Sequence, residues 1–333
     1  MNPSSIFVLG RTPELAAAEL SAVLPQAKFS TLSPQVLLSN DAAADAKALL
    51  SRLGGTVKIG EVIANSFNAA ALADDVASRH GSGKALFGIS WMARGRSAAH
   101  LARGLEVKTL LKQRGINARL VTSRAAQLPA AAINRHGAIE YLVLPTGQLA
   151  RTVAAQDVDD FTRRDVGRPN RDLKSGTLPP KVARMMVNLA QVPAGGTLLD
   201  PFCGSGTILT EALLAGVASV VGVDISPKAV AQSQDNVRWL KQHYPQTAAA
   251  QVRVQVGDVR NLAATLGRER VAAIVTEPYL GPPRRGRESK AQLAATMAKL
   301  SALYADAFGQ FSQMLLPGGR AVFPSLSVAE NLR

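Results

Sequence analysis

The chain has 333 residues, of which 47% are hydrophobic, and this length suits about two domains with sizeable cores. Its single cysteine, Cys203, excludes an intramolecular disulfide and a structural zinc site built on two or more cysteines. The 38 Lys and Arg residues outnumber the 24 Asp and Glu residues, and the net charge of +14 suits a polyanionic partner.

The sequence carries no signal for a membrane or for export. No window approaches the roughly 18 uninterrupted apolar residues of a membrane span, and the first residues lack the basic start and apolar run of a signal peptide. We therefore expect a soluble, cytoplasmic protein without a membrane partner.

The first half of the chain mixes strands and helices without a nucleotide-binding signature. Apolar runs predict strands at residues 6–9, 35–38, 56–63, 85–90, 118–122 and 139–144. One helix begins at Pro13, and a second is predicted over residues 98–114. We expect an α+β domain over residues 1–155.

Basic residues gather in three stretches. Residues 94–124 hold eight bases and the single acid Glu106, residues 163–181 are also rich in bases, and a third group surrounds Glu288. Aromatic residues make up only 5% of the chain, which disfavours a platform for stacking single strands. Contacts to the backbone and shape of a folded nucleic acid fit better, and a generally basic surface is the alternative.

Residues 156–178 read as a linker, because Asp, Arg, Gly and Pro dominate them. After this segment the pattern becomes regular. Strands are predicted at residues 197–199, 220–223, 252–256, 271–275 and 320–323. Apolar residues on one helical face predict a helix around Val182 to Leu189 and a long helix from Leu293 to Leu315. Further helices are expected at residues 207–215 and 227–243, with a short one after Asp258. Alternating strands and helices predict a parallel, doubly wound sheet over residues 179–333.

The strongest motif is the turn Asp-Pro-Phe-Cys-Gly-Ser-Gly-Thr at residues 200–207, which leaves a strand and enters a helix. Gly204 and Gly206 allow a tight turn and the close approach of a ligand. A dinucleotide fingerprint needs another small residue where Leu209 stands, and the lysine of a triphosphate-binding loop is missing. Binding of NAD or of a nucleoside triphosphate is therefore disfavoured.

Acidic residues end three of the predicted strands, at Asp200, Asp224 and Asp258. The carboxyl ends of neighbouring parallel strands share one crevice. Asp224 can accept from two ribose hydroxyls, Asp258 can accept from an adenine amino group, and Asp200 suits a cationic end. A ligand with an adenosine body and a positive centre is expected, although a lone acid at a strand end is more often a turn former.

The fourth strand ends in Glu277-Pro278-Tyr279-Leu280. Here the sequence resembles the amino-group branch of S-adenosylmethionine-dependent methyltransferases, in which an acid or amide precedes Pro-Pro and an aromatic residue. The turn at 200–207, the segments 171–173 and 178–184, and the opening run 7–15 narrow the match. Together they are similar to the THUMP-containing tRNA guanosine-N2 methyltransferase family.

The resemblance implies an α/β fold, in which an α+β THUMP-like RNA-binding domain precedes a Rossmann-like methyltransferase domain. The cofactor it implies is S-adenosylmethionine, with no metal, and the partner is RNA, in particular tRNA, with a need for an accessory protein subunit left open. The cofactor-binding residues would be Asp200, Pro201, Phe202, Gly204, Gly206, Thr207, Asp224, Ile225, Asp258 and Val259. The residues that bind and activate the base would be Glu277, Pro278 and Tyr279. The basic stretches supply the predicted RNA contacts Arg94, Arg96, Arg103, Arg119, Arg171, Arg284 and Arg285.

Two departures from the family pattern stand out. The family has Asp-Pro-Pro-Tyr where this chain has Glu277-Pro278-Tyr279-Leu280, so the acid is one methylene longer and the aromatic residue comes one place early. Only ten residues follow Phe323, so either the fold is trimmed of the usual last strands or the sequence is a fragment. The alternatives are a DNA methyltransferase acting on cytosine N4 or adenine N6, a methyltransferase acting on a protein glutamine, and an RNA-binding protein without catalysis.

Overall fold

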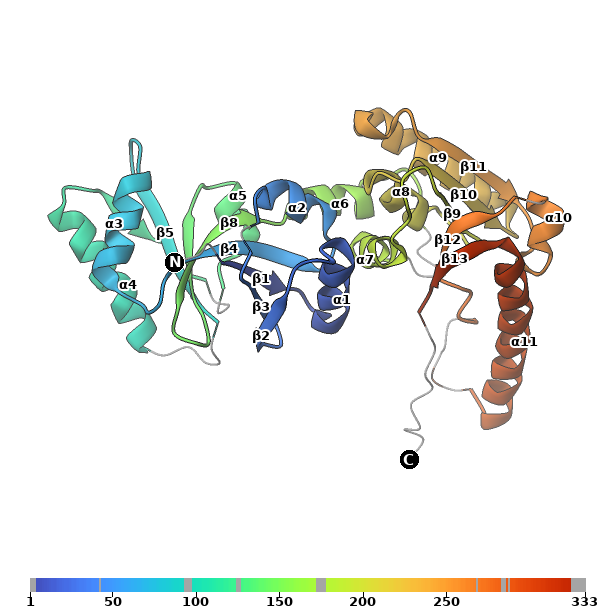
Figure 1. Ribbon diagram of the computed structural model, residues 1–333, viewed down its shortest axis with the longest axis horizontal. Helices are drawn as coiled ribbons and strands as arrows, with labels where there is room; N and C mark the ends of the chain where they lie inside the picture. The colour runs from blue at the N-terminus through green and yellow to red at the C-terminus, as the bar shows by residue number, and fades with distance from the viewer. Residues whose placement is uncertain are drawn as a thin grey trace. The chain divides into compact units, whose positions relative to one another are not determined.

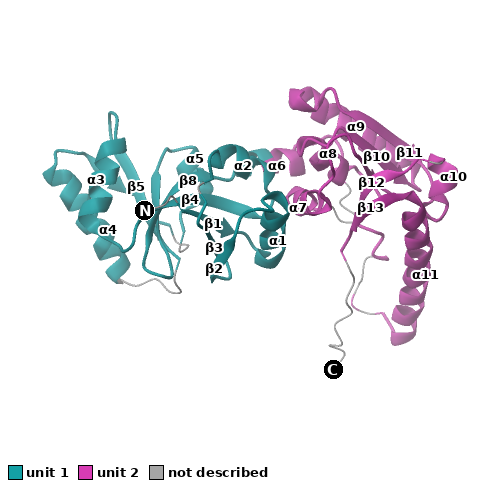
Figure 2. Ribbon diagram, viewed as in Figure 1, with its two compact units in different colours: residues 1–160 teal, residues 161–333 magenta. Residues whose placement is uncertain are grey.

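The chain divides into two units, Met1–Asp160 and Phe161–Arg333 (Figures 1 and 2). The computed structural model describes residues 4–41, 43–92, 98–123, 127–171, 178–267, 269–282, 286 and 288–324. We describe each unit by itself.

Unit 1 contains an eight-stranded mixed sheet in the order β2-β3-β1-β4-β8-β7-β5-β6. The strands are β1 (Ser5–Leu9), β2 (Phe29–Ser33), β3 (Val36–Ser39), β4 (Thr56–Ala64), β5 (Ala85–Trp91), β6 (Ala118–Leu120), β7 (Ile139–Val143) and β8 (Leu149–Ala155). The helices are α1 (Pro13–Val23), α2 (Ala46–Arg52), α3 (Ala69–Arg79), α4 (Ala98–Gln113) and α5 (Ala130–Asn134). Strands and helices form the expected α+β unit, and its identity as a THUMP-like domain stays a prediction.

The unit contains strands and helices that the sequence pattern did not indicate: β2, β8, α2, α3 and α5. Strand β8 is central, with antiparallel pairing to β4 and to β7. It carries Arg151, whose guanidinium is held by Asp75 and Glu61, both at 2.8 Å. A strand that contains an arginine looks like a surface segment in the sequence, because its acidic partners come from distant parts of the chain.

Helix α4 turns an apolar face to the core and a basic face outwards. Val107 and Leu111 are fully buried, whereas Arg103, Lys108 and Lys112 are exposed. The middle of the basic stretch at residues 94–124 therefore lies on an exposed helix face of unit 1.

Unit 2 contains a five-stranded parallel sheet in the order β11-β10-β9-β12-β13. The strands are β9 (Thr197–Asp200), β10 (Ser219–Asp224), β11 (Gln251–Val256), β12 (Val271–Val275) and β13 (Leu315–Val322). The helices are α7 (Pro180–Ala190), α8 (Thr207–Leu214), α9 (Pro227–His243), α10 (Leu262–Leu266) and α11 (Lys290–Met314), with short 3-10 turns at Pro245–Thr247 and Val259–Asn261. Each strand predicted in this half is present, and β13 begins five residues earlier than predicted.

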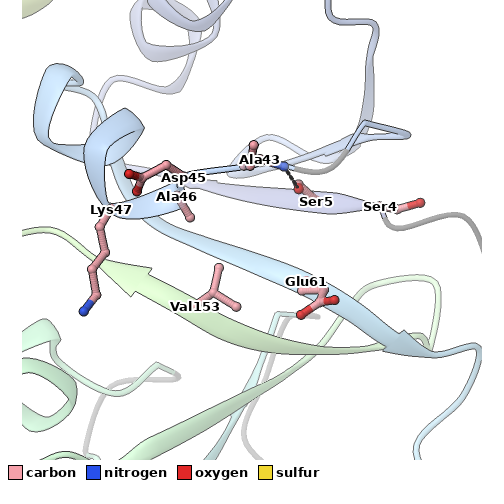
Figure 3. A pocket seen from close by; sticks show the side chains of 9 residues that line it. Ser4, Ser5, Ala43, Asp45, Ala46, Lys47, Glu61 and Val153 are labelled. Atoms are coloured by element: carbon pink, nitrogen blue, oxygen red, sulfur yellow. Dashed lines mark hydrogen bonds between the residues drawn. The ribbon is translucent and has the colours of Figure 1, made fainter.

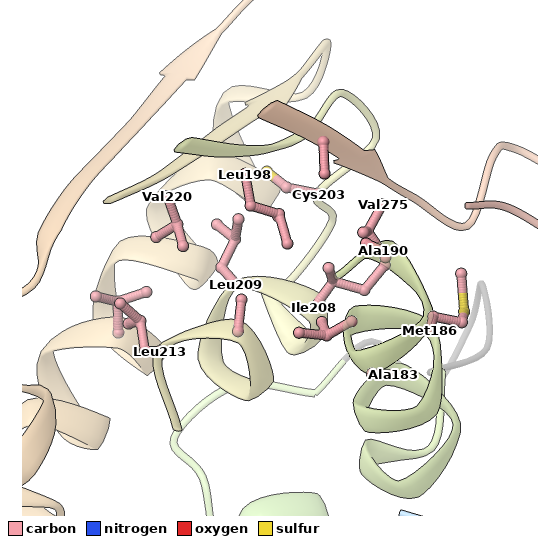
Figure 4. Packing of buried hydrophobic residues seen from close by; sticks show 14 of the residues in the cluster. Ala183, Met186, Ala190, Leu198, Cys203, Ile208, Leu209, Leu213, Val220 and Val275 are labelled. Carbon is pink, nitrogen blue, oxygen red and sulfur yellow. The ribbon is translucent and has the colours of Figure 1, made fainter. Parts of the chain in front are cut away.

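Helices cover both faces of the sheet, which confirms the doubly wound arrangement. On one face, side chains of α7, α8 and α9 pack against the sheet, with Leu198, Leu209 and Leu240 fully buried. Figure 4 shows Ile208, Leu209 and Leu213 of α8 and Met186 of α7 gathered beneath Leu198 and Val220 of the sheet. On the other face, α10 and α11 cover Leu199, Val221 and Ile274.

The segment at residues 156–178 is not the featureless linker that its composition suggested. It contains helix α6 (Val158–Val166), which carries the buried Arg164. The Arg164 guanidinium pairs with Glu211 of α8, and Arg184 of α7 pairs with the same carboxylate at 2.8 Å. Polar residues here are part of a buried ion cluster, whereas the exact bounds of the domains at 1–155, 156–178 and 179–333 stay a prediction.

No helix within the described ranges is both long enough and apolar enough to span a lipid bilayer.

Candidate active site

The candidate site lies where the strand order of the parallel sheet reverses. Strand β9 has β10 on one side and β12 on the other, so the connections leave β9 and β12 in opposite directions. Asp200 is the last residue of β9, Asp224 is the last residue of β10, and Glu277 follows β12. In open parallel sheets, ligands bind at the carboxyl ends of the strands at such a switch point.

The turn after β9 is held by the neighbouring strand. The N–H of Cys203 donates to the carbonyl of Val223 at 3.0 Å, and the N–H of Gly204 donates to the Asp224 carboxylate at 2.9 Å. Gly204 and Gly206 have φ angles of +51° and +83°, in the left-handed region that favours glycine. The predicted need for glycine at these two positions is confirmed.

Substituting Gly206 is expected to destabilise unit 2 more than substituting Gly204. A Cβ at Gly206 would lie 3.2 Å from the Cβ of Ser233 and closer still to its hydroxyl, whereas a Cβ at Gly204 meets nothing within 4 Å. Gly206→Ala should lower the free energy of unfolding by about 1 to 3 kcal/mol, and Gly204→Ala by roughly 1 kcal/mol from strain alone. Urea denaturation of both variants checks this, and equal losses would contradict the role of Ser233.

Asp200 is enclosed at the centre of the site. Its side chain accepts from the Thr276 hydroxyl at 2.7 Å and from the N–H of Phe202 at 3.2 Å. Burial raises the pKa of the Asp200 carboxyl to about 7, and the nearby charges of Asp224 and Glu277 act in the same direction. Because both charges act on Asp200, the acids at the ends of β9 and β10 and after β12 lie close together.

Asp224 and Ile225 form a polar and an apolar surface side by side. The Asp224 carboxylate accepts from Gly204 and from the N–H of Ser226, each at 2.9 Å. The side chain of Ile225 is 67% exposed, which is unusual for a large apolar residue at the end of a buried strand. This pair can hold a group with hydroxyls on one side and a flat apolar ring on the other.

Asp258 follows the neighbouring strand β11 but is already engaged. The Arg260 side chain donates to both carboxylate oxygens at 3.0 Å, and this hydrogen bonding holds the pKa of Asp258 below its usual range. Asp258 also caps the short turn of Val259–Asn261. The sequence pattern did not indicate that Arg260 would donate hydrogen bonds to the Asp258 carboxylate.

Glu277, Pro278 and Tyr279 lie together after β12. Pro278 is buried and Glu277 is partly buried, and burial raises the pKa of the Glu277 carboxyl. Tyr279 is 53% exposed, and its carbonyl accepts from the hydroxyl of Tyr304 at 2.7 Å. Helix α11 thus fixes the backbone of this turn while the Tyr279 ring stays accessible.

The structure adds residues that the sequence did not single out. Asn236 of α9 is fully buried, and its amide donates to the carbonyl of Ser205 at 2.8 Å and to that of Asn170 at 2.9 Å. Arg168 is buried and donates to the hydroxyl of Thr207 at 2.7 Å. A polar residue on the buried stripe of α9 was the available signal for Asn236, and Arg168 had none.

The remaining predicted residues fall into four groups. Pro201, Gly206, Thr207 and Val259 are buried and Phe202 is partly buried around the turn. Arg103 and Arg119 are exposed on unit 1, and Arg103 lies 5.0 Å from the centre of the Phe67 ring. Arg171 in unit 2 pairs with Asp165 at 3.5 Å. Arg94, Arg96, Arg284 and Arg285 lie outside the described residues.

Cys203 is a packing residue and not a nucleophile. It is buried, and burial raises the pKa of its thiol further above its ordinary value. A thiol that stays protonated in an apolar site is inert.

A separate hollow of about 410 Å³ lies in unit 1, bordered by Ser5, Asp45, Lys47 and Glu61 (Figure 3). Ser5 accepts there from the N–H of Ala43 at 2.8 Å. None of the predicted site residues that the structure describes lines this hollow.

Comparison with known proteins decides the family of the second unit. Residues 168–323 match the family model UPF0020, described as an RMKL-like methyltransferase domain. Residues 168–323 are a UPF0020 methyltransferase domain. This domain contains each residue predicted for the cofactor and for the base.

Curated relatives resemble this methyltransferase domain in sequence. A tRNA (guanine(10)-N2)-dimethyltransferase from Methanothermobacter thermautotrophicus is 46% identical over 106 residues, which are 32% of this chain and 28% of that protein. One from Methanocaldococcus jannaschii is 39% identical over 107 residues, 32% of this chain and 29% of that protein. The chain therefore spans less than a third of the length of these relatives.

Solved structures share the fold of the methyltransferase domain and its preceding unit. TrmN from Thermus thermophilus aligns with a TM-score of 0.57 at 18% identity, covering 96% of this chain and 88% of that one. A possible methylase from Clostridium difficile 630 aligns with a TM-score of 0.52 at 14% identity, covering 94% and 87%. These neighbours confirm the predicted α/β fold with a Rossmann-like methyltransferase sheet.

Proposed function

We propose that this protein transfers a methyl group from S-adenosylmethionine to an exocyclic amino group of an RNA base, in particular N2 of a guanosine in tRNA. The observation that carries the proposal is the convergence of Asp200, Asp224 and Glu277 at the switch point of a methyltransferase domain. Asp224 at the end of β10 offers a carboxylate for a ribose, and Glu277 after β12 offers a hydrogen-bond acceptor for an amine.

The residues present fit the proposed cofactor. Asp224 offers carboxylate oxygens for the ribose hydroxyls, and the exposed Ile225 offers an apolar surface for the adenine ring. Open space beside Gly204 leaves room for a ligand against the turn. Asp258 would reach the adenine amino group only if it exchanged one of its contacts with Arg260.

Once bound, S-adenosylmethionine supplies an already activated methyl group, so the chain's task is alignment and charge stabilisation. An exocyclic base amine is a poor nucleophile, because its lone pair is delocalised into the ring. The Glu277 carboxylate and the Pro278 carbonyl would accept its two N–H bonds and stabilise the developing positive charge. The exposed Tyr279 ring would pack on the base, which must leave its stack.

Affinity for the cationic cofactor is expected to rise with pH through about 7. The pKa of Asp200 is raised to about 7, so the carboxyl is largely protonated below that pH when no cation is nearby. A cation favours the carboxylate, so binding releases a proton and strengthens as pH rises, then levels off. Calorimetry at pH 6 and pH 8 measures the affinity for S-adenosylmethionine and the affinity for S-adenosylhomocysteine, the product whose sulfur is uncharged. The quantity compared between the two pH values is the ratio of these two affinities. The Asp200→Asn variant should show a ratio that no longer changes with pH, and an unchanged slope in this variant would contradict the assignment.

Three observations support RNA as the substrate. The chain carries a net charge of +14, and the exposed face of α4 presents Arg103, Lys108 and Lys112. The relatives named above are called tRNA methyltransferases. Phosphate contacts of this kind weaken steeply as salt rises from roughly 50 to 200 mM.

The test offers methyl-labelled S-adenosylmethionine together with unmodified tRNA, duplex DNA and protein, followed by nucleoside analysis of the labelled product. Label in tRNA that is recovered as N2-methylguanosine supports the proposal. Label in DNA or protein, or no transfer by a chain that binds the cofactor, contradicts it.

A further inference from the structure

Next to the turn that connects β9 to α8 lies a buried arginine with unused donors. Arg168 is 5% exposed, and one terminal nitrogen of its guanidinium donates to the Thr207 hydroxyl at 2.7 Å. Its Nε and its other terminal nitrogen are buried and have no acceptor among the described residues. Buried guanidinium donors without acceptors are rare in folded proteins, because each lost hydrogen bond destabilises the fold.

The N-terminus of helix α8, which carries a partial positive charge, lies beside Arg168. An α-helix leaves its first N–H groups without partners inside the helix. For Thr207, Ile208 and Leu209, the described part of the chain supplies no acceptor outside the helix either. The partial positive charge of a helix N-terminus and a guanidinium therefore act on one spot.

Other charged groups lie around Arg168 and act on it. Arg164 and Arg184 share the carboxylate of Glu211, and Arg171 pairs with Asp165 at 3.5 Å. In the part of this cluster that the structure describes, Arg168 lies with three further guanidinium groups and with the carboxylates of Asp165 and Glu211. An anion at the free donors of Arg168 would balance part of this charge.

We propose that Arg168, together with the N-terminus of α8, binds the α-carboxylate at the amino-acid end of the cofactor. This inference rests on the proposed function. If the adenosine lies on Asp224 and Ile225 and the methyl group beside Glu277, the amino-acid end lies along the turn that leads into α8. A carboxylate matches the two remaining donors of one guanidinium, which present a planar fork.

The experiment compares two ligands that differ only in this carboxylate. S-adenosylhomocysteine carries it, and 5′-deoxy-5′-(3-aminopropylthio)adenosine keeps the adenosine, the thioether and the amine but lacks it. Calorimetry on the full chain measures both affinities for the wild type and for Arg168→Gln, Arg168→Lys and Arg238→Gln. Arg238 is a matched control, because it is an exposed arginine of α9 that pairs at the surface with Asp235.

We expect the wild type to bind S-adenosylhomocysteine roughly 10- to 100-fold more tightly than the amine. Arg168→Gln should remove this preference without weakening the amine, Arg168→Lys should keep part of it, and Arg238→Gln should keep all of it. An equal loss of affinity for both ligands in the Arg168 variants would show a purely structural role and overturn the inference. Equal binding of both ligands by the wild type would also overturn the inference. This comparison needs no variant, so it tests the inference even if Arg168→Gln does not fold. Absence of binding of either ligand to the wild type would instead overturn the proposed function itself.

Discussion

Replacing Glu277 with glutamine should lower the rate of methyl transfer by roughly 100- to 1,000-fold, because the charge that accepts the amine N–H is removed. Glu277 follows β12 and is partly buried, and its charge acts on Asp200 across the site. Binding of the cofactor should change little, because the adenosine is expected at the ends of β10 and β11. Single-turnover transfer to tRNA measures the rate, and calorimetry measures cofactor binding.

The matched variants are Glu277→Asp and Glu269→Gln. Aspartate restores the shorter acid of the family pattern and should keep much of the rate. Glu269 is an exposed acid that pairs with Arg253, and its replacement should leave transfer unchanged. A rate for Glu277→Gln within about fivefold of the wild type would mean that the amine is held by other groups.

The second large effect concerns stability. Replacing Glu211 with alanine should lower the free energy of unfolding of unit 2 by about 3 to 5 kcal/mol, because it leaves buried guanidinium charge without this carboxylate. Glu211 is fully buried, and its carboxylate accepts from Arg184 Nε at 2.9 Å and also pairs with Arg164.

Tryptophan fluorescence during urea denaturation can report on unit 2 alone. The chain has two tryptophans, with Trp239 in unit 2 and Trp91 in unit 1, so a Trp91→Phe background isolates the signal. Glu269→Ala in this background removes an exposed carboxylate, and its effect should stay within about 0.5 kcal/mol. A loss below about 1 kcal/mol for Glu211→Ala would show that water reaches the cluster and stabilises the two arginines.

Much of unit 2 could be predicted because its signals are local. Buried parallel strands are short apolar runs, and the helices between them have one apolar stripe, so β10, β12 and α9 followed from periodicity alone. The site followed from the same regularity, since residues after successive parallel strands meet at one edge. The convergence of Asp200, Asp224 and Asp258 was predicted in this way, whereas the role of Glu277 came from the resemblance of residues 277–280 to a family motif.

The parts that escaped prediction depend on partners far away in the sequence. Strand β8 and helix α6 carry arginines, and the pattern of charges resembles that of exposed segments. Arg151 meets Asp75, and Arg164 meets Glu211, only when the chain has folded. No window of neighbouring residues contains either pairing. The hydrogen bonds between Arg260 and Asp258 are local, since the two residues are two positions apart. They still escaped prediction, because an arginine side chain can reach several neighbours and no spacing rule says which one it contacts.

The buried cysteine offers a way to time the motion of this turn. Cys203 is the sole thiol of the sequence, is 5% exposed, and packs against Gly222 behind the loop that carries Gly204 and Gly206. A maleimide or a disulfide reagent can reach it only when the loop lifts from the sheet. The labelling rate of the wild-type chain therefore measures how often the loop opens. A ligand bound to the loop should lower this labelling rate.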